Sequence, residues 1–506
     1  MKRSRKEDLS EHLLNVDDSI LENAYEVDSA EKLKKYMKEK KKSVKPPFYS
    51  TPAFRKKMTA AACCLLVIGI LFAIPALNPQ TPPVTPPPEE AVDYTQFFIS
   101  PAAEKADVDW RDAYTEEYKA FLEKLELFAA KLTQKVYAYS DKKTNIAVSP
   151  VSVYMALALA VECTNGDTRN ELLDAVGVTY GEVASFTKIL YAFSNEKFWS
   201  GIPYAKAEDS AFVELANSIW MDDNVTLTDT GIGSLVNDYN CDLFHVDFQD
   251  SKASKAIEAY IKDKTHGIID GAIDVSPETL ITLINTFYLK EVWKHNGTDL
   301  ELTEQEYGFQ NADGSLTQTK LLEGLYFSGK AYEGEGYTSF YTTTATGFKV
   351  KFILPKDGYT LEEVFTAENI YRINNISDYK GSDYENKLLH STRVLFPEYE
   401  ASYEGDLTKI LQNEFGITSA FDPERSDFSG ITEEDLVLES VVHKCELTVT
   451  KEGIVGGATT DAYYGDGSSN WKEVYHDYVV DRAFGFVIAD SYGSILFSGT
   501  VNFVAQ

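Results

Sequence analysis

An unbroken run of 20 residues without a charged side chain, MTAAACCLLVIGILFAIPAL from Met58 to Leu77, is the feature that most constrains this chain. About 20 apolar residues are enough for one helix to cross a bilayer, so the run predicts a transmembrane helix. A buried core helix is the alternative, but the flanking charges disfavour it. The basic residues lie on the N-terminal side of the run: Lys40, Lys41, Lys42, Lys45, Arg55, Lys56 and Lys57.

This asymmetry predicts an orientation. Loops on the cytoplasmic side of a membrane are the ones enriched in Lys and Arg, which places the N-terminus in the cytoplasm and the long C-terminal part outside. A cleaved signal peptide would normally begin closer to residue 1 and end in a small-residue site. We therefore predict an uncleaved, single-pass anchor in the cell membrane, with the rest of the chain extracellular.

Charge is distributed unevenly on the two sides of the run. Residues 1–57 carry 15 Lys and Arg against 10 Asp and Glu, while the whole chain has a formal net charge of −31. The part beyond residue 57 is therefore strongly acidic. Nucleic acid and anionic membrane surfaces are bound by clustered Lys and Arg, so the charge argues against both as main partners of that part.

Composition divides the chain into four parts. We expect a charged cytoplasmic tail at 1–57, the transmembrane helix at 58–77, an acidic, proline-rich linker at 78–110 and a globular domain at 111–506. The linker contains NPQTPPVTPPPEE, and proline-rich sequences of this kind are extended and semi-rigid.

The globular part mixes two periodicities. Apolar residues recur at helical spacing in 116–137, 149–162 and 251–267. Runs rich in β-branched and aromatic residues predict strands at 278–290, 346–355, 443–450, 484–490 and 494–504. Helical patterns come early and strands late, without strict alternation, which predicts an α+β fold with large sheets.

Motifs for catalysis are missing from the sequence. It has no glycine-rich phosphate loop, no GxSxG nucleophile elbow and no HExxH zinc motif. Cys163, Cys241 and Cys445, the three cysteines beyond the apolar run, lack metal-ligand spacing, so we interpret them as buried free thiols. We expect neither a cofactor nor a metal, and a hydrolase is disfavoured because no nucleophile constellation appears.

Five motifs, in order along the chain, resemble the serpin family. They are NIAVSPVSVYMALALAVECTNGDTRNEL, FHVDFQDSKASKAIEAYIKDKTHGIID, LINTFYLKEVW, VHKCELTVTKEG and ILFSGTVNF. The residues at characteristic positions are Asn145, Ser149, Pro150, Ser152, Gly166, Thr168, Asn285, Trp293, His443, Lys444 and Gly453. The resemblance covers about residues 111–506. It implies three β-sheets, eight or nine helices and an exposed reactive-centre loop.

The resemblance also implies a function. In that family a serine protease attacks the loop and forms an acyl-enzyme, and the cut loop then enters the large sheet as a new strand. We therefore expect a membrane-anchored member of bacterial origin that inhibits serine proteases as a suicide substrate, with cysteine proteases as a second target class. It should be a monomer and not an enzyme. The alternative is a non-inhibitory member that acts as a surface binding module.

A long, glycine-rich stretch from Thr450 to Val474 corresponds to the loop. Loops of this length are usually functional or disordered. Between 454 and 464 it has no proline and alternates like a strand, with the only charge, Asp461, on one of its two faces. The implied hinge residues are Gly453, Ile454, Val455, Gly456, Gly457, Ala458, Thr459 and Thr460.

His443 has two interpretations. It could be a general base, but neither a serine nor a cysteine motif accompanies it. The resemblance instead places it with Ser149, Ser152 and Asn285 in a polar cluster beneath the strands that must separate when the loop enters. We favour this sheet-opening cluster.

The scissile bond has two candidate positions. Counting forward from Gly453 with the family's usual loop length gives Gly467–Ser468, whereas counting back from the segment Asp481–Phe484 gives Lys472–Glu473. A lysine offers an ammonium group to the acidic specificity pocket of trypsin-like proteases, and glycine offers no side chain. On recognition we favour Lys472.

Overall fold

The computed structural model describes residues 92–102, 114–193, 212–269, 275–293, 300–344, 347–376, 382–383, 386–454 and 472–504. The chain divides into two units, Met1–Glu89 and Glu90–Gln506, and the described residues all belong to the second. The predicted tail and the predicted anchor at 58–77 lie outside them. Among the described residues, no helix has both the length and the apolar character needed to cross a membrane.

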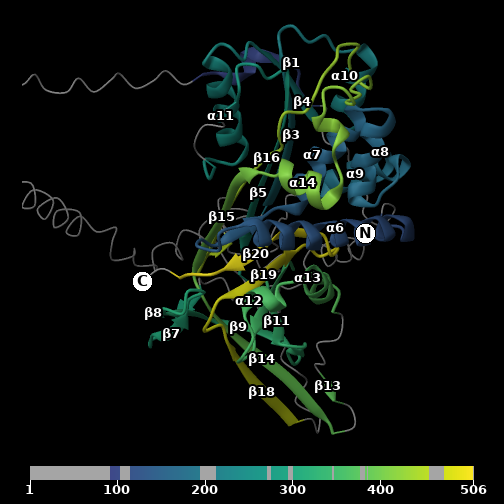
Figure 1. Ribbon diagram of the computed structural model, residues 1–506. Coiled ribbons are helices and arrows are strands. Elements are labelled where there is room, and N and C mark those ends of the chain that lie inside the picture. The colour runs from purple at the N-terminus through teal and green to yellow at the C-terminus, as the bar shows by residue number, and fades with distance from the viewer. Residues whose placement is uncertain are drawn as a thin grey trace, which may run out of the picture. The chain divides into compact units, whose positions relative to one another are not determined.

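A seven-stranded sheet, here called sheet A, organises the domain (Figure 1). Its strands are, in order across the sheet, β1 (Phe98–Ser100), β4 (Cys241–Val246), β3 (Phe212–Asp222), β5 (Ile281–Val292), β17 (Gly453–Ile454), β16 (Val442–Thr450) and β15 (Tyr399–Asp406). Strands β3 and β5 pair antiparallel over ten residues, from Phe212–Lys290 to Met221–Ile281.

Two further large sheets complete the β-structure. The six-stranded sheet has the order β10 (Tyr332–Glu333), β11 (Tyr337–Thr343), β12 (Lys349–Pro355), β19 (Phe484–Ala489), β20 (Ile495–Val501) and β2 (Ile146–Val148). The five-stranded sheet has the order β13 (Ser382–Asp383), β14 (Leu388–Pro397), β9 (Leu321–Ser328) and β6 (Glu301–Leu302), with β18 (Lys472–Val479) paired to β14. A hairpin of β7 (Tyr307–Gln310) and β8 (Leu316–Thr319) stands apart from these sheets.

Nine α-helices lie within the described residues. They are α6 (Glu116–Tyr139), α7 (Pro150–Cys163), α8 (Gly166–Val176), α9 (Tyr180–Phe193), α10 (Asp229–Asp238), α11 (Lys252–Lys264), α12 (Leu361–Val364), α13 (Ala367–Asn374) and α14 (Thr408–Phe415). The α+β prediction, with its eight or nine helices, is confirmed by this arrangement.

Helices cover both faces of sheet A. Figure 1 shows α11 on one side of β3 and β5, and α7, α8 and α9 on the other. Under α11, Trp220 stacks on Phe244 with ring centroids 3.8 Å apart, and Tyr260 of α11 packs edge-on against both rings. Helix α7 is buried along most of its length, because its sequence is apolar on nearly all sides.

The segment expected to be linker contributes to this sheet. Residues 94–97 form a short 3-10 helix, η2, and β1 pairs antiparallel with β4. Phe98 stacks on Phe244 at 4.5 Å, and the hydroxyl of Tyr94 donates to Oδ2 of Asp263 at 2.6 Å. The domain therefore begins before residue 111, since the half-buried aromatic residues that follow the proline-rich stretch pack against α11 and β4.

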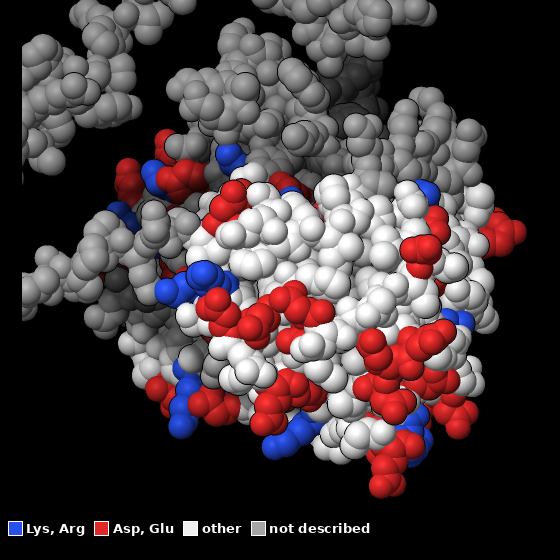
Figure 2. Space-filling model, turned by 90° about the horizontal axis from the view of Figure 1, so that it is seen from above, with Lys and Arg blue, Asp and Glu red and all other residues white. Residues whose placement is uncertain are grey.

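One end of the domain is acidic. Figure 2 views the molecule from the end at which β1 and α10 lie in Figure 1, and carboxylates outnumber basic side chains on the described part of that face. Carboxylates repel phosphate groups, so this face is unsuited to nucleic acid or anionic lipid.

Candidate functional site

Strand β17 occupies an unusual place in sheet A. It directly follows β16 in the chain, pairs with it through Val449–Ile454, and also pairs with β5 through Ile454–Glu291. Within the described residues, β5 and β16 form no ladder with each other, and β17 separates them at one end. The start of the glycine-rich stretch is thus already a strand of sheet A.

The turn that leads into β17 depends on Gly453. This residue has φ +142°, a conformation that side chains disfavour. Ile454 follows with no exposed surface and packs in the main hydrophobic core. The other predicted hinge residues, 455–460, lie outside the described residues.

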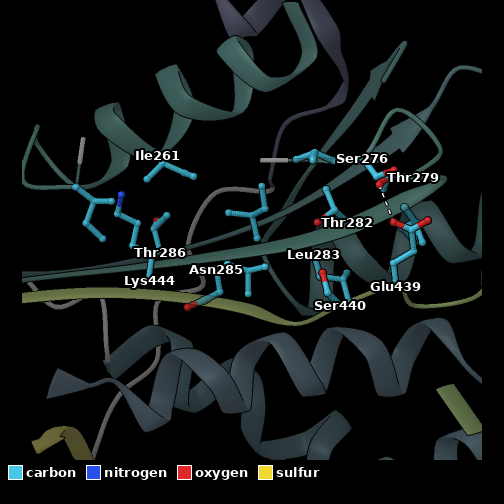
Figure 3. A pocket seen from close by; sticks show the side chains of 15 residues that line it. Ile261, Ser276, Thr279, Thr282, Leu283, Asn285, Thr286, Glu439, Ser440 and Lys444 are labelled. Atoms are coloured by element: carbon cyan, nitrogen blue, oxygen red, sulfur yellow. Dashed lines mark hydrogen bonds between the residues drawn. The ribbon is translucent and has the colours of Figure 1, made fainter. Parts of the chain in front are cut away.

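Beyond β17, the space between β5 and β16 contains a cavity, here called the slot (Figure 3). Its volume is about 280 Å³. Residues of β5 and β16 line its two sides, and Ile261 of α11 lies over it. Thr282, Asn285, Thr286, Ser440 and Lys444 give the slot a partly polar lining, which suits a backbone that brings its own hydrogen-bonding groups.

The predicted sheet-opening cluster is brought together beside the slot. From α7, the hydroxyl of Ser152 donates to Oδ1 of Asn285 on β5. The backbone N–H of Ser149, which precedes α7, donates to Nε2 of His443 on β16 at 3.2 Å. One helix end therefore holds both strands that flank the slot.

Asn217 of β3 is a member of this cluster that sequence reasoning missed. The amide of Asn285 donates to Oδ1 of Asn217 at 2.6 Å, and the amide of Asn217 donates to the carbonyl of Tyr239 at 2.8 Å. Asn217 has no exposed surface. An asparagine within the apolar strand FVELANSIW was the available signal, because a buried amide requires partners.

Burial lowers the pKa of His443 from 6.5 to about 4. The neutral ring suits its role as acceptor of the Ser149 N–H, and the hydroxyl of Ser149, the neighbouring serine, makes no hydrogen bond to the ring. His443 also lies near the Tyr403 ring, with centroids 6.1 Å apart. The geometry favours a structural role over a general base.

This pKa predicts a loss of stability in acid. The unfolded chain takes up a proton at His443 near pH 6.5 and the folded chain only near pH 4, so lowering the pH between these values favours unfolding. We expect the contribution of His443 to fall by roughly 2–3 kcal/mol between pH 7.5 and 4.5. Urea unfolding at both pH values measures the free energy of unfolding. Between pH 7.5 and 4.5 this free energy should fall less in His443→Gln than in the unmodified chain. An equal fall in both proteins would contradict the lowered pKa of His443.

Two hydrogen bonds link the β5 side of sheet A to the β16 side: one lies beside β17, away from the residues that line the slot, and the other crosses the slot. At the β17 end, Nε1 of the buried Trp293 donates to the carbonyl of Thr450 at 2.7 Å. At the far end, the hydroxyl of Thr279 donates to Oε2 of Glu439 at 3.0 Å, which Figure 3 shows as a dashed line. The second bond joins the segments just before β5 and β16.

The candidate scissile bonds lie in different places. Lys472 and Glu473 are the first residues of β18 and pair with Leu388 and Leu389 of β14. The N–H of Lys472 donates to the carbonyl of Lys387 at 2.8 Å. A protease could bind this bond only after the beginning of β18 had left β14. Gly467 and Ser468 lie outside the described residues.

Comparisons with known proteins identify what this chain is similar to. A family model described as "Serpin (serine protease inhibitor)" matches residues 123–503. Alpha-1-antiproteinase 2 of Equus caballus is 27% identical over 349 residues, covering 66% of this chain and 76% of that protein. Corticosteroid-binding globulin of Ovis aries is 28% identical over 341 residues, covering 66% and 74%.

Among solved structures, the native state of the thermophilic serpin tengpin matches with a TM-score of 0.61 at 21% identity. The match covers 81% of this chain and 98% of tengpin. At this identity the likeness concerns the fold alone.

Proposed function

Because the chain belongs to the serpin family, we propose that its domain inhibits serine proteases by inserting its cleaved loop into sheet A. The observation that carries the proposal is β17, a strand already placed between β5 and β16 at the mouth of the slot. Insertion then needs no new fold. It extends an existing strand into an existing cavity.

The chemical step is acyl transfer. The serine oxygen of the protease attacks the carbonyl carbon of the scissile bond, and the bond to nitrogen breaks as the amine takes up a proton. An ester then joins the inhibitor to the protease. Inhibition requires that the loop enter sheet A before water hydrolyses this ester.

The hydrogen bonds gained when the loop enters sheet A supply a driving force comparable with the stability of a whole domain. Each new backbone hydrogen bond contributes about 0.5–1.5 kcal/mol net, so a dozen bonds contribute on the order of 10 kcal/mol. That is comparable with the roughly 5–15 kcal/mol that stabilises a whole domain. The form with the slot open is therefore metastable under the proposal.

The register of β17 predicts where the loop residues would lie. If its pairing continued residue by residue, Thr460 would lie between Asn285 and His443, the two strand residues of the sheet-opening cluster. Asp461 would then lie between the buried Ile284 and Val442, which is 43% exposed, so that its carboxylate would meet water on the Val442 side. The loop sequence suits the slot in this register.

The test uses residues 90–506 and a panel of serine proteases. A complex that survives boiling in detergent, with loss of protease activity, supports inhibition. Clean cleavage of the loop with full protease activity contradicts it and supports the alternative, a surface binding module. The similarity to corticosteroid-binding globulin is the observation that favours this alternative.

Within this proposal, the bait residue is Lys472. We expect a trypsin-like protease to release a C-terminal peptide that begins at Glu473, because the lysine ammonium fits an acidic specificity pocket. Mass spectrometry identifies the peptide. Lys472→Ala should abolish its release, whereas Lys387→Ala, which changes a neighbouring exposed lysine, should not. A peptide that begins at Ser468 would contradict the assignment.

The location and the partners are part of the same proposal. A membrane anchor at 58–77 would hold a monomeric inhibitor on the outer surface of a bacterial cell, where it would meet secreted serine or cysteine proteases. The 20-residue uncharged run and its basic flank support the anchor. Membrane flotation of the full chain, compared with a chain that lacks residues 1–77, tests this part.

A further inference from the structure

The hydrogen bond between Thr279 and Glu439 crosses the slot at the end farthest from β17 (Figure 3). Thr279 is buried, at 5% exposure, and its N–H donates to the carbonyl of Ser276 at 3.0 Å, so a turn fixes its position. Glu439 comes from the other side of the slot, three residues before β16 begins. We call this hydrogen bond the far latch.

An inserted strand cannot coexist with the far latch. Neighbouring strands lie about 4.8 Å apart, so two strands that flank a third are separated by roughly 9–10 Å. If the register of β17 continued along the inserted strand, residue 464 would lie opposite Ile281 and Glu439. At this separation the hydroxyl of Thr279 no longer reaches the carboxylate of Glu439.

The register also sets the order of events. A strand that has reached residue 460 has passed the sheet-opening cluster but lies four residues short of Glu439. The far latch is still closed at that stage. Only the last part of insertion opens it.

We propose that the far latch controls the last stage of loop insertion, and through it the division of the acyl-enzyme between trapping and release. This inference rests on the proposed function. While the latch is closed, the loop waits part-way into the slot and water can still hydrolyse the ester. Thr279 and Glu439 are positioning residues, because neither touches the reacting atoms.

The experiment removes the latch from the full chain. Thr279→Val keeps the shape of the side chain and deletes the donor, and Glu439→Ala deletes the acceptor at an exposed position. Removing one hydrogen bond to a carboxylate should speed the last stage about fivefold. Thr338→Val is the matched control, because Thr338 donates to Glu333 at 3.2 Å in the six-stranded sheet, which does not open.

Two measurements are needed. The first counts the inhibitor molecules cleaved per protease trapped, and this number should fall toward one in both latch variants. The second follows the heat-driven conversion of uncleaved chain to the inserted form, without any protease, by its gain in thermal stability. Its rate should rise about fivefold in each single variant and no further in the double variant.

The outcomes separate the two proposals. If the unmodified chain traps no protease but both latch variants still convert faster, the far latch stands and the inhibitory function fails. If the unmodified chain traps protease and the latch variants match the Thr338→Val control in both measurements, the inhibitory function stands and the far latch is wrong.

Discussion

Replacing Ile454 by arginine should convert the chain from an inhibitor into a substrate. Ile454 is fully buried at the end of β17, between Val449 and Glu291 in register, and packs in the main hydrophobic core. A buried guanidinium there removes the packing of Ile454, and its desolvation costs several kcal/mol even beside the buried carboxylate of Glu291. We expect β17 to leave sheet A and the yield of covalent complex to fall by at least about tenfold. A cost of about 1.4 kcal/mol already changes an equilibrium constant tenfold.

Detergent gels and residual protease activity measure this result. Ile454→Val is the control, since it removes one methylene and costs about 0.5–1.5 kcal/mol without adding charge. It should keep most of the trapping. If the arginine variant traps protease as well as the unmodified chain does, the buried start of the loop has no part in insertion.

Asn285→Ala should strongly destabilise the chain in the state in which the loop has not entered sheet A. The Asn285 amide accepts from Ser152 and donates to Asn217, and both of these partners are buried. Removing it leaves two polar groups without a hydrogen bond at a cost of about 1–3 kcal/mol each. We expect the free energy of unfolding to drop by roughly 2–4 kcal/mol and heat-driven conversion to become faster.

Urea unfolding tests the loss, with Asn413→Ala, a change at an exposed position of α14, as the matched control. Combining Asn285→Ala with Ser152→Ala should cost less than the sum of the two single changes, because the two residues share one hydrogen bond. Strictly additive losses would mean that the Ser152–Asn285 contact does not hold β5 to α7.

Local pattern predicted the large elements well. Helical spacing indicated α6, α7 and α11, and the continuous apolar run at 278–290 predicted most of β5. Such runs mark strands that are covered on both faces, as β5 is by α11 and α7. Strand β1 was not foreseen, because three residues carry no periodic signal and their partner, β4, lies more than 140 positions away.

At the candidate site, too, contacts between residues far apart in the sequence could not be predicted from local pattern. Its strands and helix were predicted locally, but the bond between Ser149 and His443 spans 294 positions, so only the family resemblance could bring them together. The slot itself and the Thr279–Glu439 bond follow from the register of β17 between β5 and β16. Register depends on how distant strands pair, and a single sequence does not contain that information.

The position of β1 has a practical consequence. It lies at the end of sheet A remote from β18, the strand that follows the loop (Figure 1). A sensor chip or chromatography bead that captures the chain through residues ahead of Val92 would therefore hold the domain by the end opposite to β18. The β18 end, which begins with Lys472, would then face the flowing sample, whereas capture through lysines exposed near β18 would cover it.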